Sequence, residues 1–283
     1  RLLYAALGAL ALTTPVTAQT NPTVYGSVVF GHEWEDMEAP PYGLYSMPAD
    51  NGNAIKLEVR NDAIKANGGG VYIDGMYHLV DFTRYEFEQV VTFRTFDTKN
   101  NWKLINEQTI KSYSSAASDL TYDPVGDKIY GCFKETVTST QYFLGTLNPI
   151  TGFASKIADI DEELIVLAST RDGKLYGVGA YGMLYSVDKQ TGKLTKIGQT
   201  GKSVKYSQSA TFDYASGRML WAMTPHYTNE SPELCEIDLS TGKTTTLATI
   251  PERYEFTGIY TLSPYAADNA PQTATSFGGK YEK

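Results

Sequence analysis

The sequence lacks the residues and motifs that mark several large functional classes. Its 283 residues include only 2 cysteines and 3 histidines, and acidic side chains outnumber basic ones by 32 to 24. The net charge of −8 argues against nucleic acid or an anionic membrane surface as the main partner, because both require a basic face. The chain has no G-x-S-x-G elbow, Walker loop, H-E-x-x-H motif, or G-x-G-x-x-G in a nucleotide-binding context. These common enzyme signatures are therefore missing.

Long hydrophobic runs are also missing, apart from residues 2–12 (LLYAALGALAL). This run follows Arg1 and precedes Val16-Thr17-Ala18, a site with the small residues that signal peptidase requires. It is too short to span a bilayer as a helix. We therefore expect residues 1–18 to be a signal peptide, cleaved after Ala18, and the protein to be periplasmic, on the cell surface or secreted. No cysteine follows the site, so we expect membrane attachment only through anchoring of a longer chain.

A strand-rich pattern recurs five times, most clearly in residues 174–198 (KLYGVGAYGMLYSVDKQTGKLTKIG). Each copy has a turn in which aspartate or asparagine precedes a glycine or asparagine that tolerates positive φ. The strands on both sides of the turn have a two-residue pattern of apolar and polar side chains. The aligned turn residues are Gly52, Asn101, Gly152, Gly192 and Gly242. An aromatic residue recurs in the preceding strand, where we expect core packing rather than a ligand site. The aligned aromatic residues are Tyr25, Tyr77, Tyr130, Tyr176 and Trp221.

Repeats of this length with several strands each predict a β-propeller. Four innermost strands precede their repeats as GGGVYID, SDLTYDP, VLASTRDG and SATFDYASG. The fifth is missing at the front of the chain but is present at the back, in residues 256–262 (FTGIYTL). We therefore predict an all-β fold over residues 19–264: a five-bladed β-propeller of four-stranded blades. N-terminal strands would close the ring by pairing with a C-terminal inner strand, and we expect a monomer.

The repeats LYSVDKQTGKLTKIG and LCEIDLSTGKTTTLATI resemble the degenerate propeller repeats of quinoprotein-like and WD40-like proteins. The resemblance extends over residues 23–262 and implies the fold, which hosts many functions. Residues 265–283 indicate a linker or the start of a fibronectin-III-like domain. With the signal peptide, the chain resembles the N-terminal part of multidomain exported or cell-surface bacterial proteins, whose propellers are expected to bind ligands.

The longer loops of this fold are predicted on one face of the ring, which we call the long-loop face. The opposite, short-turn face carries the tight turns. Residues 31–41 (GHEWEDMEAPP) form the most unusual of the long loops. Trp34 can stack on a sugar ring while carboxylates accept its hydroxyls, or the carboxylates can hold Ca²⁺. The alternative is a solvated acidic loop with Trp34 folded back on the blade. Apart from this possible Ca²⁺, we expect no cofactor.

Tyrosines in other long loops can add to a binding surface at little entropic cost, or they can lie there by chance. His226 begins one of these loops and can join His32 in a polar site. The predicted ligand-binding residues are His32, Trp34, Tyr85, His226, Tyr227 and Tyr254. No catalytic residue is predicted.

The remaining cysteines and histidine have structural interpretations. Cys132 and Cys235 fall in blades that are not adjacent, which favours two buried free thiols over a disulfide. His78 stands where the other repeats have glycine or alanine. A hydrogen-bonded strand histidine is expected there, with a functional site as the alternative.

Three functions remain open on the sequence. The leading hypothesis is a non-catalytic extracellular module that recognises a glycan or a protein through the long-loop face. The second is a glycoside hydrolase or lyase, because such enzymes need only two well-placed carboxylates. Acidic residues for this role would be Glu33, Asp36, Glu86, Glu88 and Glu252. The third is a structural spacer for downstream domains.

Overall fold

The computed structural model describes residues 21–29, 39–85, 88–136, 139–204, 208–226 and 230–262. The predicted signal peptide, the predicted linker and most of the acidic loop around Trp34 lie outside these ranges. The described residues form twenty β-strands and one short 3₁₀ helix, Tyr113–Ser115. In these ranges no helix has the length and apolar character needed to cross a membrane.

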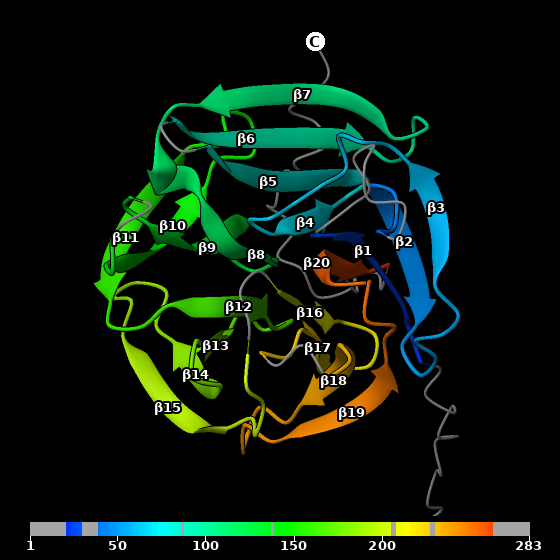
Figure 1. Ribbon diagram of the computed structural model, residues 1–283. Helices are drawn as coiled ribbons and strands as arrows, with labels where there is room; N and C mark the ends of the chain where they lie inside the picture. The colour runs from blue at the N-terminus through cyan, green and yellow to red at the C-terminus, as the bar shows by residue number, and fades with distance from the viewer. Residues whose placement is uncertain are drawn as a thin grey trace, which may run out of the picture.

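The strands form five antiparallel sheets of four, arranged in a ring (Figure 1). One blade consists of β4 (Gly70–Ile73), β5 (Met76–Tyr85), β6 (Glu88–Asp97) and β7 (Lys103–Ile110). The next consists of β8 (Ala117–Asp123), β9 (Lys128–Lys134), β10 (Tyr142–Leu147) and β11 (Ala154–Ile160). It is followed by β12 (Leu164–Ser169), β13 (Leu175–Gly179), β14 (Met183–Val187) and β15 (Leu194–Gln199). The fourth contains β16 (Ser209–Asp213), β17 (Arg218–Met223), β18 (Glu233–Ile237) and β19 (Thr244–Thr249). The predicted five-bladed propeller is confirmed.

The fifth, closing blade joins the two ends of the described chain. It contains β20 (Phe256–Thr261) innermost, followed by β1 (Thr23–Val28), β2 (Gly43–Pro48) and β3 (Lys56–Arg60). Strand β20 pairs antiparallel with β1, with Tyr25 opposite Tyr260. The buried hydroxyl groups of Ser27 and Thr257 lie 3.2 Å apart across the same pair. The predicted closure by a C-terminal inner strand is therefore also confirmed.

The tight turns form for the local reason that the repeat indicates. In the turn after β14, the Asp188 carboxylate accepts hydrogen bonds from the backbone N–H groups of Gln190 and Thr191, at 2.8 and 2.9 Å. Gly192 then takes φ of 70°, which a residue with a side chain rarely adopts. The backbone N–H of Gly192 donates to the carbonyl of Asp188 and closes the turn. Side-chain chemistry thus fixes the hairpin that connects the third and fourth strands of this blade.

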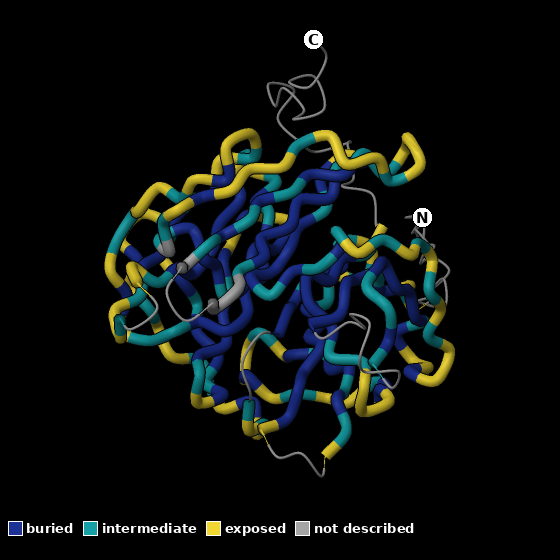
Figure 2. Tube along the Cα trace, turned by 45° about the horizontal axis from the view of Figure 1, so that its top comes forward, coloured by how far each residue is buried: buried dark blue, intermediate teal, exposed yellow. Residues whose placement is uncertain are grey.

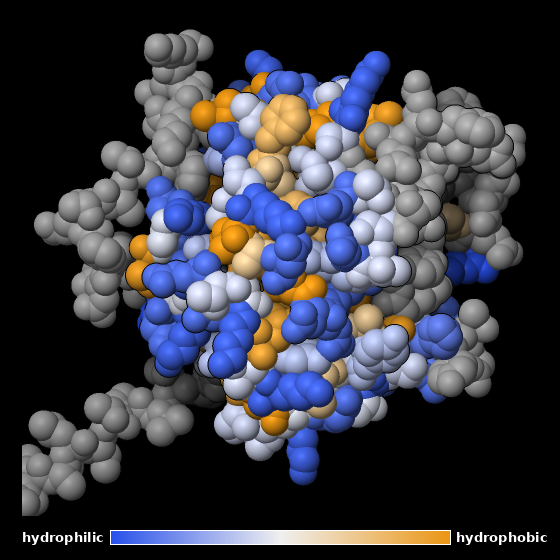
Figure 3. Space-filling view, turned by 90° about the vertical axis from the view of Figure 1, so that its left-hand side faces the viewer, coloured by the Kyte–Doolittle hydropathy of each residue, from blue (hydrophilic) through white to orange (hydrophobic). Residues whose placement is uncertain are grey.

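The hydrophobic core is divided among five clusters, each lying between two adjacent blades. Inner strands are almost wholly buried, whereas outer strands such as β15 alternate between partly buried and exposed residues (Figure 2). The side of the ring that faces the viewer in Figure 3 is mostly hydrophilic, with small apolar spots. Among the recurring aromatics, Tyr77 and Trp221 are fully buried and Tyr130 nearly so. Each blade is therefore stabilised by its neighbours, which explains why one repeat cannot fold alone.

The structural interpretations of the cysteines and of His78 agree with the structure. Cys132 and Cys235 are buried free thiols on β9 and β18, in blades separated by the blade of β12. Burial raises the pKa of each thiol to about 12, which keeps both protonated. His78 is fully buried, its Nδ1 lies 3.0 Å from the Thr95 hydroxyl, and burial lowers its pKa to about 3. It is a neutral, hydrogen-bonded strand histidine.

Candidate binding site

A buried carboxyl group, that of Asp119 on β8, connects three inner strands across the axis of the ring. It accepts hydrogen bonds from the backbone N–H groups of Leu167 on β12 and Ala210 on β16, at 3.1 and 3.0 Å. Its other oxygen accepts from the Ser209 hydroxyl at 3.0 Å, and the Ser209 oxygen in turn accepts from the N–H of Ile259 on β20. We call these groups the axial network. Because β8 and β16 belong to blades that are not adjacent, the network spans the centre of the propeller.

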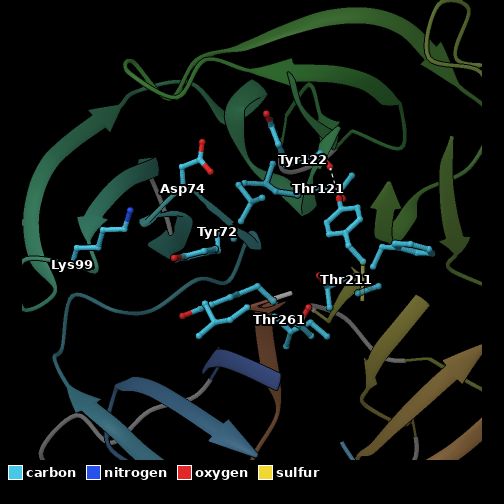
Figure 4. A pocket seen from close by; sticks show the side chains of 16 residues that line it. Tyr72, Asp74, Lys99, Thr121, Tyr122, Thr211 and Thr261 are labelled. Atoms are coloured by element: carbon cyan, nitrogen blue, oxygen red, sulfur yellow. Dashed lines mark hydrogen bonds between the residues drawn. The ribbon is translucent and has the colours of Figure 1, made fainter. Parts of the chain in front are cut away.

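A pocket of about 260 Å³ lies next to the axial network, on the short-turn side. Four inner strands, β4, β8, β16 and β20, form its walls, and we call it the axial pocket. Leu120 and Ala210 line it and come directly after Asp119 and Ser209 in the chain. The axial network therefore lies beside the inner end of the pocket, and Figure 4 shows the side chains that line it.

Aromatic rings dominate the walls of the axial pocket. They come from all four of these strands or from the turns that follow them: Tyr72, Tyr122, Phe212, Tyr214 and Tyr260. Tyr72 stacks on Tyr260 at a centroid distance of 4.7 Å and an interplanar angle of 8°. Tyr214 donates its hydroxyl to the carbonyls of Tyr122 and Ser169, at 3.3 and 3.2 Å. These contacts hold the rings in place before any ligand arrives.

Polar groups around the aromatic walls supply hydrogen-bonding capacity. Thr121, Thr211 and Thr261 contribute hydroxyls, while the exposed Asp74 and Lys99 bring opposite charges (Figure 4). The Thr121 oxygen accepts from the Ser169 N–H and can still donate, and the Thr261 hydroxyl donates to Asp213 and can still accept. Tyrosine hydroxyls are already protonated at physiological pH, and burial raises the pKa values of Tyr122, Tyr214 and Tyr260 further above the ordinary value. The pocket thus combines flat apolar rings with uncharged hydroxyl groups.

The structure describes only part of the site predicted on the long-loop face. His32, Trp34 and Tyr227 lie outside the described residues. Tyr85 was expected in a loop but ends strand β5, because the β5–β6 hairpin continues its pairing as far as Tyr85 and Glu88. The Tyr254 ring packs edge-on against Tyr45 at 5.6 Å and lies, partly buried, against a core cluster.

His226 is the predicted residue that lies beside a hollow on the long-loop face. Its backbone N–H donates to the Ser203 carbonyl, and Ser203 lines a hollow of about 560 Å³. The polar lining includes Lys202, whose ammonium group pairs with the Glu233 carboxylate. His226 and Tyr254 are not joined by a described contact, and the prediction of one aromatic funnel from these residues stays a prediction.

The residues of the axial pocket were missed because they lie on strands. The interpretation placed function in long loops, whereas these rings lie at the ends of inner strands beside tight turns. A signal was present: four inner strands carry an aromatic residue near their last position, in VYID, TYDP, TFDY and IYTL. Inner strands of a propeller converge on the axis, so the recurrence predicts a ring of aromatic side chains there.

The described residues offer no cluster of three or more histidine, cysteine, aspartate or glutamate side chains placed to hold a metal ion. The acidic loop proposed to bind Ca²⁺ lies mostly outside the described ranges, at residues 31–38. Ca²⁺ binding by that loop therefore stays a prediction.

No protein-family model and no curated protein sequence matches the chain. Among solved structures, a protein of unknown function from Bacteroides caccae aligns with a TM-score of 0.49 at 8% identity, over 84% of this chain and 98% of its own. The catalytic domain of the GH62 α-L-arabinofuranosidase from Coprinopsis cinerea aligns with a TM-score of 0.45 at 10% identity, over 84% of this chain and 78% of its own.

An auxiliary nutrient binding protein from Bacteroides ovatus aligns with a TM-score of 0.42 at 14% identity. The alignment covers 82% of this chain and 50% of that protein, so the chain spans half of its length. These similarities assign no function to this chain.

Proposed function

We propose that the protein is a non-catalytic extracellular binding module that recognises a glycan, and that the axial pocket is its binding site. The observation that carries the proposal is the combination of fixed aromatic rings and hydroxyl groups in one pocket. Sugar rings present flat apolar faces edged by hydroxyls, and such ligands are bound by stacking on aromatic rings with hydrogen bonds around them. The leader-like residues 1–18 support an extracellular setting.

The composition of the pocket favours binding over hydrolysis. Glycosidases of the common types use two carboxyl groups that flank the scissile bond, about 5–10 Å apart. Among the described residues that line the axial pocket, Asp74 is the one carboxylate. The oxygens of Asp119 are occupied by backbone and hydroxyl donors of the axial network. The proposal therefore keeps the glycan of the sequence hypothesis and moves its site to the short-turn face.

The test is a glycan-array and polysaccharide pull-down screen of the 283-residue chain, with product analysis of every bound polysaccharide. We expect binding without cleavage. Tyr72→Ala, which removes a wall of the pocket, should weaken binding at least tenfold, and Thr211→Val should weaken it about fivefold by removing one hydroxyl. Tyr181→Ala is the matched control, because Tyr181 is 83% exposed and lies outside the pocket.

The Trp34→Ala variant distinguishes a binding site on the long-loop face from one in the axial pocket. Unchanged affinity in this variant, together with the loss in Tyr72→Ala, supports the axial pocket. If Trp34→Ala abolishes binding while Tyr72→Ala binds normally, the site is on the long-loop face and the axial assignment is wrong. Cleavage products would establish a hydrolase or lyase, and silence of the whole screen would favour protein recognition or a spacer role.

A further inference from the structure

A second hollow lies directly beside the axial pocket. It has a volume of about 350 Å³ and lies between the closing blade and the blade of β4–β7, and we call it the interblade cleft. The two hollows share three lining residues: Tyr72, Tyr260 and Leu262. The axial pocket alone is slightly smaller than the usual range of about 300–1,000 Å³ for ligand sites, whereas the two together fall within it.

The wall between the hollows is a stack of three tyrosines. Tyr260 lies between Tyr25, at a centroid distance of 5.3 Å and an angle of 18°, and Tyr72, at 4.7 Å and 8°. Tyr260 is only 5% exposed and therefore acts as a fixed spacer. Tyr25 and Tyr72 are partly exposed, one lining the cleft and the other lining both hollows. Leu262, 54% exposed, adds an apolar surface common to the two.

The interblade cleft repeats the chemistry of the axial pocket with different residues. Its aromatic rings are Tyr25 and Trp102, and the Trp102 indole is fixed edge-on against the buried Tyr77 ring at 5.8 Å. Its polar lining includes Thr98 and Glu58, and Glu58 accepts hydrogen bonds from Ser46 and Lys56 at 2.6 and 2.7 Å. These bonds lower the pKa of Glu58, so its carboxylate is ionised and can accept further hydroxyl donors.

We infer that the two hollows are consecutive subsites for a linear oligosaccharide of at least two sugar units. One unit occupies the axial pocket, the chain crosses the shared edge at Tyr72 and Leu262, and a following unit lies against Trp102 with its hydroxyls directed to Glu58. This inference rests on the proposed glycan-binding function and deepens it by specifying an extended ligand. It also assigns Tyr25 to a ligand surface, although the repeat indicated core packing alone.

The experiment measures affinity against chain length. Gluco-, xylo-, manno- and arabino-oligosaccharides of one to six units are titrated into the 283-residue protein by calorimetry, with NMR for the weakly bound monosaccharides. In the series that binds, we expect affinity to rise at least tenfold from one unit to three. Trp102→Ala should remove that rise and leave the affinity for the monosaccharide unchanged. Glu58→Gln, which keeps the shape of the side chain, should reduce the rise about threefold or more.

The outcomes separate this inference from the function on which it rests. Affinity that does not change with chain length, with Trp102→Ala equal to wild type, overturns the tandem subsites and leaves the axial pocket as a single site. Failure of every series to bind overturns this inference, and together with silence of the glycan array it also overturns the proposed glycan function. If Trp102→Ala lowers the thermal stability of the protein, the Glu58→Gln variant provides the test instead. An affinity that rises with chain length in Glu58→Gln as it does in wild type counts against the interblade cleft as a subsite.

Discussion

The two ends of the propeller, its short-turn face and its long-loop face, are built from different parts of the chain. At the short-turn end, the axial pocket is lined mainly by residues of the inner strands, which the axial network and the interblade clusters hold in place. At the long-loop end, the hollow beside His226 is lined mainly by loop residues around the pair of Lys202 and Glu233. Both ends offer a concave surface, but only the first combines aromatic walls with hydroxyls among the described residues.

The difference shows how a site can be preorganised without long loops. A ligand that binds to ordered rings avoids the entropic cost of immobilising them, typically about 0.5–1.5 kcal/mol per flexible side chain. Strand residues at the axis are ordered by the same contacts that stabilise the fold. Changes at the axis should therefore affect stability and the pocket together, whereas changes on the long-loop face should be mild. Three predictions test this contrast.

The largest effect is expected for Asp119→Ala. The substitution leaves the N–H groups of Leu167 and Ala210 and the Ser209 hydroxyl without the Asp119 carboxyl group as acceptor in a buried site. Each buried polar group left unsatisfied costs about 1–3 kcal/mol, so we expect the free energy of unfolding to fall by about 3–5 kcal/mol. Urea denaturation measures it. Asp161→Ala, at an exposed position, should change it by less than about 0.5 kcal/mol, and equal effects would contradict the role of the axial network.

The next effect is a pH dependence from the same carboxyl group. Burial raises the pKa of Asp119 from 3.8 to about 8, although the four donors around it act in the opposite direction. Because the folded pKa is higher than the unfolded one, the stabilising contribution is complete below about pH 4. This contribution to the free energy of unfolding is lost as the pH rises to about 8, at a rate of up to about 1.4 kcal/mol per pH unit.

The measurement compares urea denaturation of wild type and Asp119→Asn at several pH values. Carboxylates with a lowered pKa, such as Asp188 and Asp238, make the protein less stable as the pH falls. Both proteins contain these groups, so their contribution cancels in the difference between the two stabilities. The stability of wild type minus that of Asp119→Asn should therefore decrease between pH 4 and pH 8. A difference that is constant with pH would show that Asp119 does not titrate in this window.

The smallest effect comes from a pair of glycine substitutions, one at each end. Gly258 on β20 has φ of 55°, and a Cβ there would approach the Tyr77 hydroxyl to 2.7 Å and the Gly70 Cα to 3.1 Å. Gly201 on the long-loop face has φ of 76°, with nothing within 4 Å of the added atom.

Both alanine variants introduce backbone strain of about 1 kcal/mol, and Gly258→Ala adds a packing cost of about 1–2 kcal/mol. Thermal denaturation should therefore show a clearly larger drop in Tm for Gly258→Ala than for Gly201→Ala. Equal drops would mean that the axis is no more tightly packed than the long-loop face, and the contrast between the two ends would lose its basis.

The fold could be predicted from the sequence because its determinants are local and repeated. Asp188 and Gly192 dictate their turn within five residues, and similar turns recur around the ring. The alternation of the strands sets which face is buried, and the displaced fifth inner strand at residues 256–262 identified the closure. The buried thiols and the hydrogen-bonded His78 followed from their positions in the repeat.

The candidate site could be predicted only in part, from the aromatic residue that recurs near the end of four inner strands. Tyr72, Tyr122 and Tyr260 are far apart in sequence, and their convergence depends on how four inner strands approach the axis. We used loop length to predict where the ligand binds, and this criterion selected the long-loop face. Asp119 carried no sequence signal of its importance, because its partners Leu167 and Ala210 are bound through their backbone N–H groups, which every residue except proline possesses.

The sequence by itself determined the repeat, the number of blades and the way the ring closes, because short-range turn chemistry and two-residue periodicity determine each of these. Only the tertiary structure decided which side chains meet at the axis and between the blades. Those contacts join residues such as Tyr25, Tyr72 and Tyr260, whose separations in the chain are large and whose distances depend on the packing of whole blades. Periodicity specifies the side of the sheet on which a side chain lies, whereas the packing of the blades decides which other side chains it contacts.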